Sequence, residues 1–157
     1  MRISQASDYA LRILMLLAQT DDPLRVGEIS ERLAVSNSHA MKIVAKLAGL
    51  GLVETQRGRG GGVRLAVPPD EIRLGDVVRS FEPDFAVVEC LQTAGGGCVY
   101  LPRCALKPAM LAATDAFLAC LDQYTLGRIV RGSQVPRRVE RATRPSTARR
   151  AGRQDPG

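Results

Sequence analysis

The first fifty residues carry three amphipathic segments that predict three helices. Apolar positions recur densely between Ser4 and Gln19, with neither Pro nor Gly among them, so we expect a largely buried first helix there. A short second helix is predicted where apolar side chains return at helical spacing, at Val26, Ile29 and Leu33. Ser36 is a favourable N-cap for a third helix over residues 37–48. Two short helices joined by so tight a turn are typical of a helix-turn-helix.

Two strand-like runs, residues 51–55 and 62–65, predict a β-hairpin directly after these helices. The glycines between them tolerate the positive φ of a tight turn, and Arg57 and Arg59 would stand at its tip. A glycine-rich phosphate-binding loop is the competing interpretation, but no Gly-Lys-Ser/Thr motif follows and no helix begins there. We therefore predict a mainly α fold with a small β-hairpin wing, in a winged helix-turn-helix domain over residues 1–67.

The remainder of the chain divides into a linking segment, a helix and a tail. Residues 68–104 would form a linking helix, supported by apolar positions from Ile72 to Phe81, and a loop that carries three cysteines. Apolar side chains then recur at three- and four-residue steps, which predicts one long helix over residues 105–131. The chain has too little left to cover this helix, so we expect it to pack against a second copy in a two-fold homodimer. Residues 132–157 hold almost no large apolar side chain and predict a disordered basic tail.

Positive charge is concentrated in two parts of the chain, whose net charge is +6. The tail carries seven arginines against two acidic residues, which could give a weak hold on DNA phosphates or only a solvated, dispensable end. Residues 25–64 carry seven basic against three acidic residues. This local excess, on a predicted winged helix, is what a surface that binds duplex DNA requires.

Polar and basic side chains on the third helix and the wing are therefore the candidate DNA contacts. Asn37, Ser38 and His39, at the helix start, are the candidates for base edges in the major groove. Phosphate contacts are expected from four basic residues, of which Arg59 could enter the minor groove: Lys42, Lys46, Arg57 and Arg59. The alternative is a solvated helix face on a winged helix that binds protein. A dimer would place two recognition helices ~34 Å apart on double-stranded DNA and favour a pseudo-palindromic operator.

Three cysteines lie close together after the wing, at Cys90, Cys98 and Cys104. A structural zinc site usually has close Cys pairs and a fourth ligand, and the chain's single histidine, His39, lies on the presumed DNA face. Iron-sulfur clusters accept wider thiolate spacings but usually need a fourth ligand. From spacing alone, an iron-sulfur site is favoured modestly over redox thiols, and both interpretations remain open. We expect Cys120, on an apolar face of the long helix, to be a core residue.

Other classes of protein fit the sequence poorly. An enzyme is not expected, because no pairing of a nucleophile with a general base is visible in the sequence. The three cysteines have no evident base, and the single histidine belongs to the third helix. No apolar run approaches the ~18 residues of a membrane span. The start of the chain also lacks the pattern of a signal peptide. We expect a cytoplasmic protein without a membrane partner.

Several motifs resemble the IscR and NsrR family of bacterial winged-helix regulators, over about residues 1–131. They include residues 1–12, the start of the third helix at 36–43, the wing at 57–65 and the three cysteines. Short segments at 82–83, 104–107 and 121–126 are most similar to NsrR, the nitric-oxide-sensing branch. The interval from Cys90 to Cys98 instead matches RirA, a related rhizobial iron-responsive repressor.

This resemblance implies a cofactor, a ligand set and a signal. It implies a homodimeric repressor with one iron-sulfur cluster per subunit, [4Fe-4S] in preference to [2Fe-2S], bound by Cys90, Cys98 and Cys104. The fourth ligand would be Asp8 of the partner subunit; by position alone, Asp8 would only complement the dipole of the first helix. Nitric oxide is the signal implied, with iron supply as the RirA-like alternative. A zinc-dependent or thiol-redox regulator remains the alternative from the residues themselves.

Overall fold

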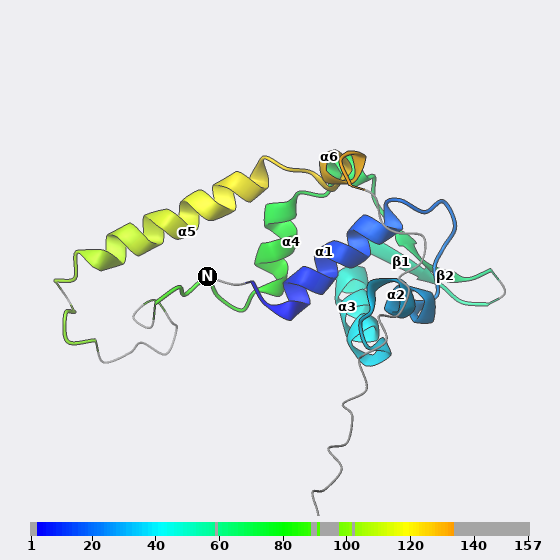
Figure 1. The fold of residues 1–157 in the computed structure, drawn as a ribbon, viewed down its shortest axis with the longest axis horizontal. Helices are drawn as coiled ribbons and strands as arrows, with labels where there is room; N and C mark the ends of the chain where they lie inside the picture. Colours follow the sequence, from blue (N-terminus) through cyan, green and yellow to red (C-terminus); the bar gives the residue numbers. More distant parts are fainter. Residues whose placement is uncertain (1–2, 59, 89–90, 92–97, 102, 134–157) are drawn as a thin grey trace, which may run out of the picture.

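A central helix organises the fold. The computed structural model describes residues 3–58, 60–88, 91, 98–101 and 103–133. Helix α1 (Gln5–Leu17) lies in contact with α2, α3, α4, α6 and strand β2 (Figure 1). Its inner side chains are fully buried, with Ala10, Ile13 and Leu14 at 0% exposure. The prediction of a buried first helix is confirmed.

The predicted helix-turn-helix is also confirmed. Helix α2 (Val26–Leu33) is followed by α3 (Asn37–Gly49), and Ala34 between them adopts a left-handed conformation with φ of 53°. The turn is closed by a hydrogen bond from the Val35 backbone N–H to the Ser30 carbonyl, at 3.1 Å. Ser36 caps α3 as expected, since its side chain accepts from the His39 backbone N–H. The turn thus fixes α3 across the core, with one face left to solvent.

The wing is a two-stranded antiparallel hairpin. Strands β1 (Val53–Gln56) and β2 (Gly62–Leu65) pair from Val53 opposite Leu65 to Gln56 opposite Gly62. Val53 and Val63 point into the core and are each 2% exposed. The backbone of Leu24 exchanges two hydrogen bonds with Val63, at 3.0 and 2.8 Å, so the segment before α2 extends the hairpin. This contact fastens the wing to the helix-turn-helix.

Helix α4 returns the chain to the core after the wing. A short 3-10 turn, η1 (Pro69–Glu71), leads into α4 (Leu74–Phe81), which packs against α1. Val77 and Val78 are 1% exposed and Phe81 is 5% exposed. The linking helix predicted after the wing is therefore present, and its apolar face completes the core beside α1.

The single long helix predicted over 105–131 is divided in the structure, and that prediction is wrong. Helix α5 (Leu106–Asp122) ends before Thr125, whose extended backbone and side chain cap a separate helix, α6 (Leu126–Arg131). The break has a physical cause: the Leu126 N–H donates to the Ile72 carbonyl at 2.8 Å, and the Leu74 N–H donates to the Tyr124 carbonyl at 3.0 Å. Leu126 is then fully buried, at 0% exposure. Helix α6 therefore belongs to the core around α1 and η1.

Helix α5 extends away from this core (Figure 1). Within the described part of the chain its one buried residue is Thr114, and Leu106 and Leu111 are exposed. It is held to α4 by Arg79, whose guanidinium makes two 2.7 Å contacts with the Asp122 carboxylate. Its apolar side chains are exposed or only half-buried in the single chain, and dimerisation through this face stays a prediction. None of the described helices is both long and apolar enough to span a membrane.

Candidate nucleic-acid interface and cysteine segment

The exposed face of α3 is the first candidate interface. Its buried side chains recur at steps of one to four residues and lie on one face of the helix: Ala40, Ile43, Val44 and Leu47. At 100° per residue the opposite face centres on Ser38, Lys42 and Ala45, with Met41 beside them. Each of these side chains is exposed, as is Asn37 in the first turn. The predicted contacts Asn37, Ser38 and Lys42 therefore lie on an open surface.

Two predicted contacts, His39 and Lys46, lie on a flank of α3 that faces the rest of the protein. The His39 ring lies 6.2 Å from the Tyr9 ring of α1, centroid to centroid. The Lys46 ammonium lies 4.5 Å above the ring of Phe81 in α4. Both residues remain exposed, so phosphate contact stays possible while each also joins α3 to a neighbouring helix. A cation over an aromatic face contributes about 0.5–1 kcal/mol at an exposed site.

The wing presents Arg57 at its tip, exposed to solvent. Gly58 and Gly60 take φ values of 101° and 78°, which confirms the expectation that the turn needs glycine. Arg59 lies outside the described residues. The predicted wing contacts are thus described for Arg57 alone.

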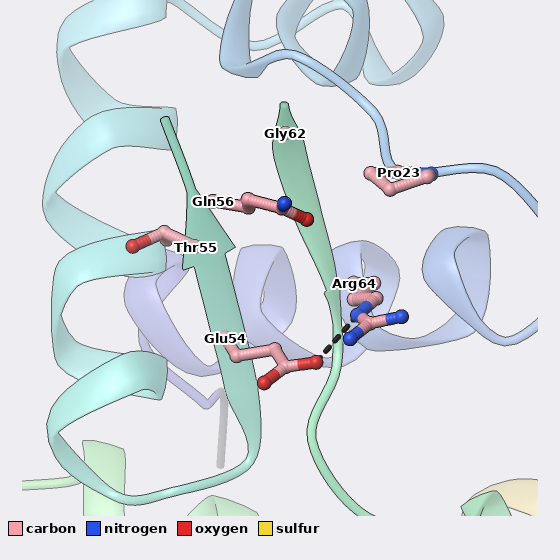
Figure 2. Close-up of a pocket in the computed structure, with 6 residues that line it drawn as sticks. All are labelled: Pro23, Glu54, Thr55, Gln56, Gly62 and Arg64. Carbon is pink, nitrogen blue, oxygen red and sulfur yellow. Dashed lines mark hydrogen bonds and ion pairs between the residues drawn. The ribbon is translucent and has the colours of Figure 1, made fainter. Parts of the chain in front are cut away.

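A shallow hollow lies beside the wing. It has a volume of about 280 Å³ and is lined by polar side chains of both strands, including Glu54, Gln56 and Arg64, together with Pro23 (Figure 2). The carboxylate of Glu54 accepts a hydrogen bond from Arg64 across the two strands. Glu54 and Arg64 therefore offset each other's charge on the side of this hollow.

Asp8 lies in the first turns of α1 with its carboxylate partly open to solvent. Its side chain is 37% exposed and pairs with Arg12 one turn later, at 2.9 Å. An exposed pair of this kind contributes about 0.3–0.5 kcal/mol, so the fold depends little on Asp8. The carboxylate is therefore accessible to a ligand from outside the chain.

Glu82, which follows α4, joins that helix to the start of α1. Its carboxylate accepts from the Ser4 backbone N–H at 2.8 Å and from the Ser7 hydroxyl, and Ser7 is 0% exposed. Burial raises the pKa of Glu82, but the hydrogen bonds from Ser7 and Ser4 outweigh it and hold the pKa below its ordinary value. This contact could not be predicted from the sequence, because Glu82 and Ser7 are 75 residues apart and nothing near either residue indicates the other.

The cysteine segment is described in part. Cys98 and Cys104 are half-buried and free of disulfides, and Cys90 lies outside the described residues. Cys98 opens a turn in which its carbonyl accepts from the Leu101 N–H at 3.1 Å. In the part of the chain that the structure describes, no three metal-ligating side chains gather at one point. The two free thiols nevertheless supply donors of the kind that an iron-sulfur cluster takes.

The expectation for Cys120 is wrong in the single chain. Its side chain is exposed on α5 and does not contribute to the core. Helix α5 extends away from the core (Figure 1), so the position of Cys120 on this helix is not covered by the rest of the chain.

Comparison with known proteins then decides the family. A model for the Rrf2 family, described as "Iron-dependent Transcriptional regulator", matches residues 3–132. The chain belongs to the Rrf2 family. The predicted resemblance to IscR and NsrR regulators is thereby confirmed, and the chain is a transcriptional regulator, not an enzyme.

Individual Rrf2 relatives agree with this assignment. The transcriptional regulator NsrR of Bacillus subtilis is 41% identical over 136 residues, which are 85% of this chain and 93% of that protein. CymR, the global cysteine regulator of B. subtilis, has a TM-score of 0.70 at 26% identity and covers 85% of this chain and 99% of its own. The structure of IscR from T. potens has a TM-score of 0.69 at 23% identity, covering 89% of this chain and 93% of its own, and shows the shared fold.

Proposed function

We propose that this Rrf2 protein is a homodimeric repressor that binds double-stranded DNA under the control of an iron-sulfur cluster. The observation that carries the proposal is the conjunction of an open, polar α3 face with free thiols on a separate segment, in a chain 41% identical to NsrR. Base edges would be contacted by Asn37 and Ser38, and phosphates by Lys42 and Arg57. His39, Lys46 and Arg59 complete the proposed contact set.

The cluster would be held by Cys90, Cys98 and Cys104, with Asp8 of the partner subunit as fourth ligand. Carboxylate oxygen is a harder donor than thiolate for cluster iron, so Asp8 is the weakest of the four. When bound, the cluster supplies iron that reacts with nitric oxide, the signal that we propose. A [4Fe-4S] cluster is the proposed form.

Asp8 is well placed to act on DNA binding through its own helix. It precedes Tyr9, whose ring lies against that of His39 at the start of α3. A ligand contact at Asp8 therefore restrains the helix that supports the recognition helix. The cluster in contact with Asp8 would be held by the cysteines of the other subunit, so the contact would fix the separation of the two recognition helices. Loss of the cluster would then let this separation vary, and affinity for an operator with two half-sites would fall.

Purification without oxygen, with assays of iron, sulfide and DNA binding on one sample, tests this function. We expect a straw-brown protein that contains iron and sulfide in equal amounts, and that bleaches and releases DNA on titration with nitric oxide. Cys98→Ala and Cys104→Ala should lose the iron, whereas Cys120→Ala is the matched control and should keep it. Asp8→Ala should fold and dimerise but hold the cluster less firmly. Iron-free protein that keeps its DNA affinity would refute the proposal.

A thiol-redox regulator is the second candidate, because the structure places Cys120 in the open. The structurally similar CymR of Staphylococcus aureus has a crystal structure of an oxidized form. In that case the wild-type protein would be colourless, and DNA binding would respond to peroxide but not to nitric oxide. Loss of this response in Cys120→Ala would identify the thiol concerned.

A further inference from the structure

Met41 is an unusual side chain for the surface of α3. Its side chain is 58% exposed. Among the described residues before the cysteine segment, Leu50 is the one other large apolar side chain that is exposed, at 42%. A methionine on a helix of a small module ordinarily lies in the core, where its burial stabilises the fold. In this position it contributes little to folding beyond helix propensity, which Gln or Lys would match.

The neighbours of Met41 make it project from the helix. Ser38 and Ala45, one turn before and after it, are both exposed and short. The long thioether side chain therefore stands above the short side chains that adjoin it on the helix surface. The edge of a base pair that approached this face would contact Met41 before the small side chains of Ser38 and Ala45.

We propose that Met41 is a specificity-determining residue of the DNA interface and contacts the 5-methyl group of a thymine. The inference rests on the proposed function, since it takes α3 as the helix in the major groove. In that groove the thymine methyl is the one apolar group on the base edges, and apolar side chains are its usual partners. The flexible thioether can adapt to the position of the methyl group. Asn37 and Ser38 supply polar contacts, so Met41 adds discrimination that hydrogen bonds alone would not give.

Uracil in place of thymine tests this contact, because it removes only the methyl group. The protein, purified with its cofactor under anaerobic conditions, first selects its preferred sites from a pool of random DNA duplexes. Each thymine of the selected half-site is then replaced by uracil in both halves. Burial of one methyl group corresponds to about a fourfold change in affinity. Because the substitution is made in both half-sites, we expect the affinity for DNA to fall about 15-fold at the one thymine position that Met41 contacts.

Two variants assign the effect to Met41. Met41→Gln should bind the thymine and uracil duplexes equally, since its amide has no preference for the methyl group. Leu50→Gln makes the same chemical change at the other exposed apolar residue, at the far end of α3, and should keep the wild-type sensitivity. Both substitutions lie on the surface, and their unfolding midpoints should match that of the wild type.

The outcomes separate the two proposals. A selected site at which no thymine is sensitive to uracil would overturn the role of Met41 but leave DNA binding intact. Equal uracil sensitivity in the wild type and in Met41→Gln would do the same, because another residue would then contact the methyl group. If no duplex is enriched at all, the proposed function fails as well.

Discussion

Replacing Glu82 by Gln removes one negative charge from the junction of α4 and α1 while keeping the size of the side chain. In the wild type this carboxylate accepts from the Ser4 N–H and from the buried Ser7 hydroxyl. Hydrogen bonds to a charged group contribute about 1.5–3 kcal/mol, against about 0.5–1.5 kcal/mol for neutral pairs. Because Glu82 is partly exposed, we expect Glu82→Gln to lower the free energy of unfolding by about 1–2 kcal/mol at neutral pH.

Urea denaturation at a series of pH values measures this effect and its sign. The pKa of Glu82 is lowered in the folded protein, so its stabilising effect is complete above the ordinary pKa that the group has when unfolded and is lost as the pH falls through the lower, folded value. Gln does not titrate. The difference in unfolding free energy between wild type and Glu82→Gln should therefore be largest near pH 7 and shrink on acidification.

Two further variants isolate the junction. Glu31→Gln alters net charge equally on the exposed surface of α2 and should leave the unfolding midpoint almost unchanged. Ser7→Ala, alone and combined with Glu82→Gln, completes a double-mutant cycle in which we expect a coupling of about 1 kcal/mol. A wild-type midpoint for Glu82→Gln at pH 7, or a difference that does not change with pH, would refute this account of the junction.

Three further predictions concern α5, α6 and their contacts with the rest of the fold. Leu126→Ala should lower the unfolding free energy by about 3 kcal/mol because this side chain is fully buried, whereas Leu111→Ala should weaken self-association in a sedimentation assay with little effect on folding. Gly27→Ala, in open space, should stabilise by about 0.5–1 kcal/mol in thermal melts, whereas Gly127→Ala should gain less, since its new Cβ would lie 2.2 Å from the Asp70 Oδ1 and displace that side chain from Arg131. Arg79→Gln should break the link between α4 and α5 and increase protease cleavage within α5 without unfolding the core.

Local signals predicted the winged helix well. The start of α3 followed from Ser36, whose side chain caps the helix, and the hairpin followed from glycines that adopt positive φ at its tip. Such features depend on a few adjacent residues, so the sequence contains all that is needed to recognise them.

Features that depend on distant partners were missed or misjudged. The break before α6 depends on backbone hydrogen bonds from Leu74 and Leu126 to partners about fifty residues away, although the N-cap at Thr125 was a local hint. The expectation of a buried Cys120 failed because periodicity shows which face of a helix is apolar, not whether anything covers it. For the site, spacing grouped the cysteines, but only the fold shows that His39 and Lys46 also contact other helices.

The return of the chain at α6 also constrains how this protein can be made. Leu126 fills the space beside Ile72 and α1, so the winged helix acquires its last core side chain only after α5 has been synthesised. A ribosome that stopped within α5 would release a module with apolar surface uncovered, and such surfaces promote aggregation. Truncation to the winged helix alone therefore removes part of its own interior.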